Sequence, residues 1–508
     1  MEQTWLYFIS LALILFLILL KFLLKRSPQK NPPPKPPSLP IIGHLHLMKE
    51  PIHQTLEKLS KKYGPIMALR FGARPVLILS SPSAVEELFS KNDIVFANRP
   101  RGLAGKHLAY NHTTLGASSY GEHWRNLRRL ATLEMFSTAK LNAFLGIREE
   151  EVRSLLKTLF HDSRKGFVKV EMKSRFSELS FNVIMRMVAG KRYFGVDAED
   201  SDEAREFRVL IRDIFELSGA SNYPGDFVPF LRWIDFGKME RKMVKIERKM
   251  DAFFQGLIDE KRSEGAKDFE QKGGKTKSMT DSMLGLQDSD PRYYSDEIIK
   301  GNIQSMLGAG TDTSASTIEW ALSLLLNHPD ILNKARAELD AVVGEYRLAD
   351  ESDMCKLPYL QNIINETLRL FPAAPLLLPH ESSDDCTIGG FQVERETMLL
   401  VNAWAIHRDP KVWVEPTSFR PERFESGEID AYNLLPFGIG RRSCPGAGLA
   451  NRVVGLALAT LIQCFEWKRI SEELVDLSEG QGLLIAKAKP LEAMCRARER
   501  MVDVLSGL

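Results

Sequence analysis

The spacing of apolar and polar residues changes several times along the chain. Residues 5–24 are almost all apolar, which predicts a membrane-spanning helix. Residues 66–71 alternate and residues 75–80 follow after a Gly-Ala-Arg turn, which predicts a β-hairpin. From about Ala84 onward the period is helical for most of the chain, apart from a second β-rich patch at residues 386–401 with a Gly-Gly turn. The pattern therefore predicts a mainly α-helical fold with small β-sheets.

The first apolar run is long enough to cross a bilayer, because 20 helical residues at about 1.5 Å each reach roughly 30 Å. A cleaved secretory signal would have positive residues before the run and small residues after it, and neither is present. Instead, Lys21, Lys25 and Arg26 lie at or after its carboxyl end, which predicts that this side faces the cytosol. We therefore expect residues 1–26 to be a single-pass signal anchor.

Residues 27–40 are dense in proline and cannot form a helix. They could be a ligand for a proline-recognition domain, but their position directly after the anchor favours a stiff, extended hinge. Residues 41–508 then form the body. Within it, an aromatic stretch at 222–236 precedes a basic helix, a pattern equally typical of a segment that dips into a membrane and of an ordinary core segment. The charged stretch 261–278 predicts an exposed loop.

Composition and charge exclude several classes of function. A net charge of +2 is too small to indicate a nucleic-acid partner. The five cysteines are widely spaced, without a C-x-x-C pair, and there is no H-E-x-x-H, so neither a zinc site nor a disulfide framework is indicated. No G-x-G-x-x-G follows a strand, so the chain has no nicotinamide or flavin site of its own, and any electrons must come from a partner protein.

The strongest chemical signal is the loop at residues 437–446, which reads F-x-x-G-x-R-x-C-x-G. Its glycines allow a tight turn close to a flat macrocycle, its amides can point at a thiolate, and Arg442 places positive charge near an anionic sulfur. A lone cysteine near glycines is usually structural, but here the whole signature is intact. It resembles the haem-binding loop of the cytochrome P-450 family. The resemblance implies haem b, with Cys444 as the axial iron ligand and with Phe437 and Arg442 beside the cofactor.

Polar residues interrupt a long apolar helical pattern at residues 309–314. Such residues usually hydrogen-bond only to the carbonyl one turn earlier, but beside a haem thiolate a hydroxyl fed by a carboxylate suits proton delivery to dioxygen. The segment resembles the family's oxygen-activation motif, which implies Thr313 as the relay hydroxyl, Asp312 as its feeder and Ala309 beside the haem. We expect Gly310 to leave room for oxygen. The intact Asp312–Thr313 pair favours monooxygenation over isomerisation, dehydration or a non-catalytic haem sensor.

Glu366 and Arg369 stand at i, i+3 among apolar neighbours, so we expect them near the core, where the pair needs further partners. Arg423, in Pro-Glu-Arg-Phe, is a candidate. The two motifs resemble the family's E-x-x-R and P-E-R-F elements, which implies that the three residues brace the core around the haem loop and are not catalytic.

Trp124 and Arg128 lie one helical turn apart and share a face. They resemble the family's W-x-x-x-R helix, which implies that both can hydrogen-bond one haem propionate. His380 matches a position that holds a propionate in related enzymes, although alone it would be read as a plain loop histidine.

The substrate pocket of the family maps onto apolar residues of this chain, which predicts a hydrophobic substrate bound mainly by shape. The predicted pocket residues are Leu376, Leu377, Leu378, Leu483 and Leu484. Close relatives usually carry a threonine where Leu484 stands and a proline where Ala486 stands, so neither the substrate nor the position of attack is carried over from them.

Residues 96–100 (F-A-N-R-P) and 489–495 resemble a plant group that includes isoflavone hydroxylases and lignan methylenedioxy-bridge-forming oxygenases. The resemblance implies a monooxygenase of the endoplasmic reticulum membrane with its body in the cytosol. It would use O2 and electrons from NADPH, delivered by NADPH-cytochrome P-450 reductase, to oxidise or ring-close a hydrophobic specialised metabolite. We expect a phenolic substrate; the alternatives are a terpenoid, or oxygen-independent isomerisation or dehydration.

Overall fold

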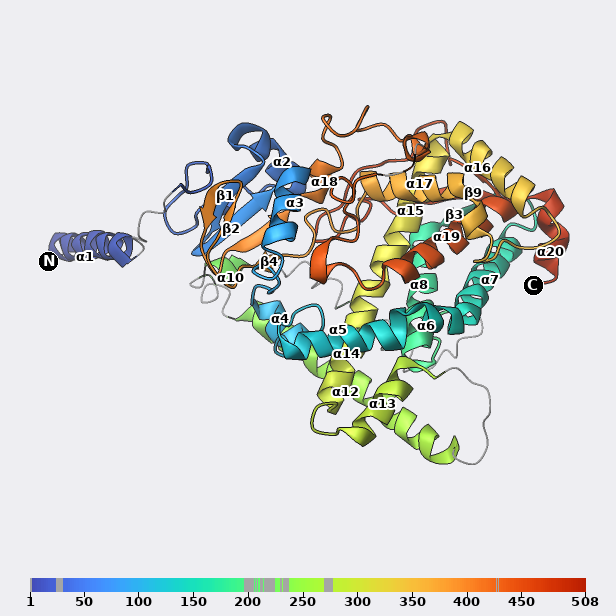
Figure 1. Cartoon of the computed structure of the whole chain (residues 1–508), viewed down its shortest axis with the longest axis horizontal. Coiled ribbons are helices and arrows are strands. Elements are labelled where there is room, and N and C mark those ends of the chain that lie inside the picture. Colours follow the sequence, from blue (N-terminus) through green and yellow to red (C-terminus); the bar gives the residue numbers. More distant parts are fainter. Residues whose placement is uncertain are drawn as a thin grey trace.

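A computed structural model gives the fold of the chain (Figure 1). It describes residues 2–23, 31–195, 224–228, 237–268, 277–425 and 429–508, with isolated positions at 205, 207, 209, 210, 213, 231 and 427. In this part of the chain the fold is mainly α-helical with small sheets, which confirms the prediction. The helices before residue 200 are α1 (Glu2–Leu23), α2 (Ile52–Tyr63), α3 (Pro82–Lys91), α4 (Leu103–Leu108), α5 (Glu122–Ala131), α6 (Thr138–Ala143), α7 (Leu145–Asp162) and α8 (Met172–Ala189). The later helices are α10 (Pro224–Phe227), α12 (Lys238–Asp268), α13 (Met279–Ser289), α14 (Asp296–Gly310), α15 (Asp312–Asn327), α16 (Pro329–Val342), α17 (Pro358–Leu370), α18 (Ala403–Ile406), α19 (Ala447–Cys464) and α20 (Val502–Ser506).

Helix α1 stands apart from the rest of the chain in Figure 1. Its apolar side chains are exposed, among them Trp5 at 71% and Phe8 at 68%, so they pack against nothing in the described protein. The apolar stretch found within α1 is Tyr7–Leu17. Of the described helices, α19 is the one long and apolar enough to cross a membrane, but 72% of it is buried inside the protein, which makes it a core helix.

The described part of the hinge, residues 31–40, has no helix and lies along the body. The Ala68 N–H donates to the Pro34 carbonyl at 2.8 Å, and Pro33 and Pro36 are buried. This half of the hinge is therefore extended, but it is a packed strap and not a spacer that stands free of the body.

The first sheet has the order β1-β2-β7-β4, and its strands are β1 (Ile66–Phe71), β2 (Arg74–Leu79), β7 (Met398–Val401) and β4 (His380–Glu381). Strands β1 and β2 form the predicted antiparallel hairpin, with Ile66 opposite Leu79. Its turn requires Gly72, whose φ is +58° and where a Cβ would come within 1.8 Å of the Phe227 carbonyl oxygen. The predicted Gly-Gly turn joins β5 (Cys386–Ile388) to β6 (Phe391–Val393).

A third sheet, ordered β3-β9-β8, was not predicted. Its strands are β3 (Val168–Glu171), β9 (Glu492–Ala497) and β8 (Phe465–Lys468). Each is short and pairs across a long separation in sequence, which leaves no local hairpin signal.

Two further expectations change in the structure. The predicted loop at 261–278 is wrong at its start, because α12 continues as helix to Asp268; residues 269–276 lie outside the description. Most of segment 222–236 also lies outside it. Its described residues Phe227 and Val228 are buried against the first sheet, so they favour a core role for that part only.

Helices α14 and α15 run through the middle of the molecule, where α8 and α19 pack against them (Figure 1). The apolar faces of α15 and α19 are almost entirely buried, because each carries long runs of aliphatic residues. This arrangement sets the polar interruption at residues 309–314 inside the protein and places the cysteine loop directly before a core helix.

Candidate active site

The cysteine loop is a closed turn ahead of α19. The Cys444 N–H donates to the Phe437 carbonyl at 2.9 Å, and the Ser443 N–H to that of Gly440 at 3.1 Å. Gly438 and Gly440 have φ values of +67° and +75°, which disfavour any residue with a side chain. At Gly440 a Cβ would also lie 2.6 Å from a carboxylate oxygen of Asp93. The loop therefore needs its glycines for both conformation and space.

The Cys444 side chain is accessible, although the protein crowds its surroundings. Burial raises the pKa of the thiol, while the backbone N–H groups of Gly446 and Ala447 and the charge of Arg128 lower it. A sulfur with amides and a guanidinium directed at it is prepared to carry negative charge, which a metal ligand requires. An accessible thiol in such surroundings can meet a bound group from one side.

Helix α5 brings Trp124 and Arg128 to this loop. Arg128 Nη1 donates to the Ser443 carbonyl at 2.7 Å. The Arg442 guanidinium lies 4.4 Å from the centre of the Trp124 ring. The structure therefore brings these three predicted cofactor residues together with Cys444.

Three arginines form a positive cluster beside the loop, namely Arg99, Arg128 and Arg442. Burial lowers the pKa of Arg99 to about 10 and that of Arg442 to about 9, where the charges of Arg99 and Arg128 add to the effect. Among the described residues, their hydrogen bonds go to backbone carbonyls and none pairs with a carboxylate. The buried Nε of Arg99 has no hydrogen-bond partner. The three arginines fit an anionic group, and the two propionates of a bound haem would supply that charge.

His380 lies at the edge of this cluster. Its Nδ1 is 2.7 Å from the Phe96 carbonyl oxygen, which can only accept, so this nitrogen carries the proton. Burial and the charge of Arg99 lower the pKa of His380 to about 3. In this neutral tautomer Nε2 is an acceptor. Donation to a propionate would require a second ring proton, which the charge of the propionate itself would favour.

The central helix is broken where the polar motif lies. Helix α14 ends at Gly310, α15 begins at Asp312, and Thr311 between them has ψ of −75°. The Thr313 hydroxyl donates to the Ala309 carbonyl at 2.7 Å, which is the back-bonding expected of a threonine in a helix. Gly308 and Ala309, at the carboxyl end of α14, are exposed although Met306, Leu307 and Thr311 around them are buried, so the broken turn borders accessible space.

Asp312 is partly buried, and burial raises the pKa of its carboxyl, with Lys173 opposing the shift. The protonated acid is therefore favoured more than for an exposed aspartate. The expectation for Gly310 is wrong: a Cβ there would come within 2.5 Å of the Ile184 side chain of α8. Close helix packing explains this glycine, because the space beside it is already occupied.

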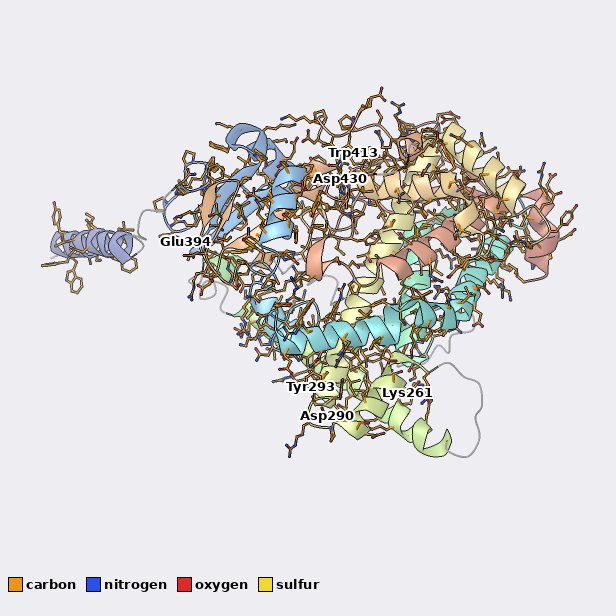
Figure 2. The ribbon with its side chains drawn as sticks, viewed as in Figure 1. Lys261, Asp290, Tyr293, Glu394, Trp413 and Asp430 are labelled. Carbon is orange, nitrogen blue, oxygen red and sulfur yellow. The ribbon has the colours of Figure 1, made fainter. Side chains whose placement is uncertain are left out.

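Glu366 and Arg369 of α17 are fully buried, as predicted, and form a two-pronged ion pair at 2.7 and 2.8 Å. Arg423 Nε donates to the same carboxylate at 2.9 Å. Trp413, labelled in Figure 2, lies beside both guanidiniums, at 5.2 Å from Arg369 and 5.9 Å from Arg423. The predicted partnership of these three charged residues is present.

His407 connects this cluster to the cysteine loop. Its Nδ1 bonds the Arg369 carbonyl at 3.0 Å, and its Nε2 accepts the N–H of Leu435 at 2.8 Å. Burial and the charge of Arg408 lower its pKa to about 3, so the ring is neutral, as this pair of bonds requires. Sequence reasoning missed His407, which has no motif around it. It also missed the contacts of Arg99, although the F-A-N-R-P signature contains that residue.

The predicted pocket residues divide into two groups. Leu378 is 43% exposed, and Leu376, Leu483 and Leu484 are partly exposed. Leu377 is 6% exposed, has φ of +52° and packs in the core near Gly438, so its prediction as a lining residue is wrong. The two segments meet where the Ile485 N–H donates to the Ala373 carbonyl at 2.9 Å.

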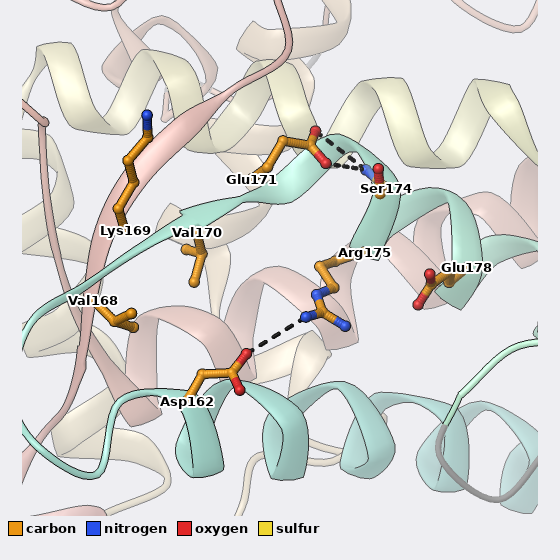
Figure 3. Close-up of a pocket in the computed structure, with 8 residues that line it drawn as sticks. All are labelled: Asp162, Val168, Lys169, Val170, Glu171, Ser174, Arg175 and Glu178. Carbon is orange, nitrogen blue, oxygen red and sulfur yellow. Dashed lines mark hydrogen bonds and ion pairs between the residues drawn. The ribbon is translucent and has the colours of Figure 1, made fainter.

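A separate surface pocket of about 560 Å³ is lined by residues that are distant in sequence from the predicted pocket residues (Figure 3). Its lining is largely charged and comprises Asp162, Val168, Lys169, Val170, Glu171, Ser174, Arg175 and Glu178. Asp162 and Arg175 pair with each other across it at 3.5 Å. None of the predicted site residues lines it, and its polarity does not suit a hydrophobic substrate.

Comparisons with known proteins agree with the geometry. Cytochrome P450 81Q32 of Catharanthus roseus is 60% identical over 469 residues, covering 92% of each chain. The (+)-piperitol/(+)-sesamin synthase CYP81Q2 of Sesamum radiatum is 53% identical and covers 92% of this chain and 90% of its own. Isoflavone 2'-hydroxylase of Glycyrrhiza echinata is 52% identical and covers 91% of each.

A solved structure of a zebra fish cytochrome P450 with progesterone has a TM-score of 0.76 and 26% sequence identity, covering 89% of this chain and 100% of its own. The family model described as Cytochrome P450 matches residues 32–494. The chain therefore belongs to the cytochrome P450 family, as a plant-type monooxygenase that uses haem b and takes electrons from NADPH through a reductase.

Proposed function

We propose that this protein oxidises a hydrophobic phenolic specialised metabolite of the isoflavone or lignan class. The observation that carries the proposal is the set of apolar side chains at accessible positions of the two predicted pocket segments, namely Leu376, Leu378, Leu483 and Leu484. Two relatives that cover at least nine tenths of the chain are named for isoflavone hydroxylation and for piperitol and sesamin synthesis. Apolar walls bind such ring systems by shape, so the position of attack depends on where the side chains of the walls lie.

Cys444 is proposed as the axial ligand. Bound haem supplies the reductive activation of dioxygen, which thiolate donation to the iron favours. The chain contributes the sulfur, the Gly446 and Ala447 amides that moderate its charge, and Arg128, which lowers its pKa. Arg99, Arg128 and Arg442 would hold the propionates, because their mutual repulsion is relieved by anions. Trp124, Phe437 and His380 complete the proposed cofactor contacts.

Thr313 and Asp312 are proposed to deliver protons. The Thr313 hydroxyl can accept a hydrogen bond at its free lone pair while it donates to Ala309. When its O–H turns away from that carbonyl, it can pass on its own proton as it takes one from the donor. Asp312 is suited to feed it, because burial favours the protonated acid. Glu366, Arg369 and Arg423 do not take part; they are proposed to stabilise the support beneath the cysteine loop through His407.

The protein is proposed to sit in the endoplasmic reticulum membrane, with residues 1–26 as a single-pass anchor, 27–40 as the hinge and 41–508 in the cytosol. The exposed apolar side chains of α1 support this placement, since such a surface is stable in lipid and unstable in water. NADPH-cytochrome P450 reductase on the same membrane face would then reach the haem domain.

The test is a spin-state titration of the protein in microsomes that also contain the reductase, using isoflavones, furofuran lignans and diterpenes as separate ligand sets. We expect an isoflavone or lignan to shift the Soret band and to give a product that depends on NADPH and O2. A shift and a product with diterpenes alone would overturn the phenolic assignment in favour of a terpenoid substrate. Product formed without NADPH or O2 would instead support an isomerase or dehydratase.

A further inference from the structure

The two segments that carry the proposed pocket residues, residues 371–378 and 479–487, both contact one buried side chain, Trp320. It lies on α15 seven residues, about two helical turns, after Thr313. Its ring stacks on Phe371 with 3.8 Å between centroids and 4° between planes. Its Nε1 donates to the Ile485 carbonyl at 3.0 Å. Phe371 lies five residues before Leu376, and Ile485 directly follows Leu484, so this single indole contacts both segments from the helix that carries the proposed relay.

Both backbone polar groups of Ile485 form hydrogen bonds with residues outside its own segment. Its carbonyl accepts from Trp320, and its N–H donates to the Ala373 carbonyl at 2.9 Å. Ile485 is 2% exposed, so an unpaired carbonyl there would have no water to replace the indole. The Lys487 ammonium also lies 4.8 Å from the centre of the Trp320 ring. The Trp320 indole therefore fixes the position of Ile485 within the segment.

The same segment comprises residues 479–487, and its base, at Glu479 and Gly480, is held by a second set of contacts. The Glu479 carboxylate accepts from His53 at 2.7 Å, from Gln54 at 2.8 Å and from the Trp404 indole at 2.9 Å. The Gly480 N–H donates to the Ala486 carbonyl at 2.8 Å, which closes a narrow loop. These bonds fix the base to α2 and α18 and do not reach the tip.

The tip, residues 481–484, has no hydrogen bond to any other segment of the described protein. Gly482 within it has φ of +132°, a conformation that glycine alone adopts easily. On the other side of Ile485, the φ angle of Ala486 is not restricted as that of a proline would be. The position of Leu483 and Leu484 therefore depends on the attachment of Ile485.

We propose that Trp320 is a specificity-determining positioning residue. Its N–H holds the Ile485 carbonyl, so that α15 sets where Leu483 and Leu484 stand relative to the oxygenation site. The inference rests on the proposed pocket but not on any particular substrate. It predicts that removing this N–H alone changes which molecules fit, while the haem site keeps its thiolate ligand.

The test compares Trp320→Phe with Trp467→Phe in the full-length holoprotein. Both replace a buried indole, but Trp467 Nε1 donates to the Leu461 carbonyl at 2.9 Å, which belongs to neither pocket segment. Two measurements are made, namely amide hydrogen exchange of the peptide spanning 479–488 and spectral titration of the haem iron with imidazole and with 4-phenylimidazole. Both are independent of turnover, so failure of the phenolic assignment does not affect them.

For Trp320→Phe we expect about fivefold faster exchange in this peptide and about fivefold weaker 4-phenylimidazole binding, as for the loss of one hydrogen bond. Imidazole is too small to reach the wall and should bind as in the wild type. Unchanged exchange and affinity, or equal changes in Trp467→Phe, would overturn the proposal. If Trp320→Phe does not bind haem, Phe371→Leu provides the second variant: it removes the stacked ring, keeps the donor, and should change the same two quantities in the same direction.

Discussion

The two sides of the proposed haem site are built in different ways. On the cysteine side, ten consecutive residues close a turn through their own backbone, with Cys444 N–H bonded to the Phe437 carbonyl and Gly440 in a left-handed conformation. On the pocket side, the walls come from α14 and α15, from residues 371–378 and from residues 479–487. They are joined by contacts between side chains and backbone, such as Trp320 to Ile485. The backbone of the cysteine loop is thus encoded locally, whereas the pocket side depends on contacts between distant segments.

The two sides also differ in their charge. The cysteine side has three arginines, Arg99 buried and Arg128 and Arg442 partly buried, without carboxylate partners among the described residues, a surplus that suits an anionic cofactor. The pocket side is apolar except for the broken helix, where burial raises the pKa of Asp312. A change on the first side should therefore affect cofactor binding, and a change on the second should affect coupling and selectivity.

The largest effect is expected from Cys444→Ser, which removes the thiolate from the locally built side. The reduced carbon-monoxide complex should lose its thiolate-type spectrum, and turnover should be abolished, because a serine hydroxyl is a far weaker donor to iron. Cys355→Ser, at an exposed cysteine away from the loop, is the control and should keep the spectrum. A thiolate-type spectrum in Cys444→Ser would refute the cofactor assignment.

Glu366→Gln tests the support beneath that side. The substitution leaves the Arg369 and Arg423 guanidiniums without their carboxylate partner, so the free energy of unfolding should fall by about 3–5 kcal/mol. Denaturant unfolding and the fraction of protein that retains haem are the measurements. Glu396→Gln, in an exposed pair with Arg395, should change the free energy by less than about 0.5 kcal/mol. Equal losses in the two variants would contradict the bracing role.

Thr313→Ala tests the pocket side at the broken helix. Product formed per NADPH should fall about tenfold, with released peroxide making up the difference, because proton delivery is lost while electron flow continues. Ser323→Ala is a matched control, since its hydroxyl also donates to a carbonyl one turn earlier on α15, at 2.7 Å to Glu319. Coupling in Thr313→Ala as tight as in this control would remove Thr313 from the proposed mechanism.

The smallest effect concerns the pH dependence of stability in Asp312→Asn. Because burial raises the pKa of Asp312 in the folded protein, its contribution to stability is fully present below its ordinary value of 3.8 and is lost as pH rises through the folded value. The free energy of unfolding of the wild type should therefore decline relative to that of Asp312→Asn as pH rises from 4 to 7. Unfolding midpoints of both proteins at several pH values measure this, and a difference that does not vary with pH would show that the carboxyl is not perturbed.

Much of the site could be predicted, because several motifs carry their own constraints. The Glu366–Arg369 pair stands among apolar residues, so its burial and its need for Arg423 followed from the cost of an unpaired charge. His407 could not be found in this way, since its two bonds go to backbone groups of distant residues. Leu377 and Gly310 were assigned to open space that the structure fills with the core and with Ile184. In each case the sequence does not show which groups pack against the residue.

The sequence by itself determined the helical class, the first hairpin, the Gly-Gly turn of the second β-rich patch, the cysteine loop and the polar break in the central helix. Each of these rests on periodicity or on backbone demands within a few residues. Only the tertiary structure decided the β3-β9-β8 sheet, the cluster of Arg99 with Arg128 and Arg442, and the attachment of the pocket segment to Trp320. These features join residues that are far apart in the chain. Their partners are selected by packing and by the need to satisfy buried polar groups, and a one-dimensional pattern does not contain that selection.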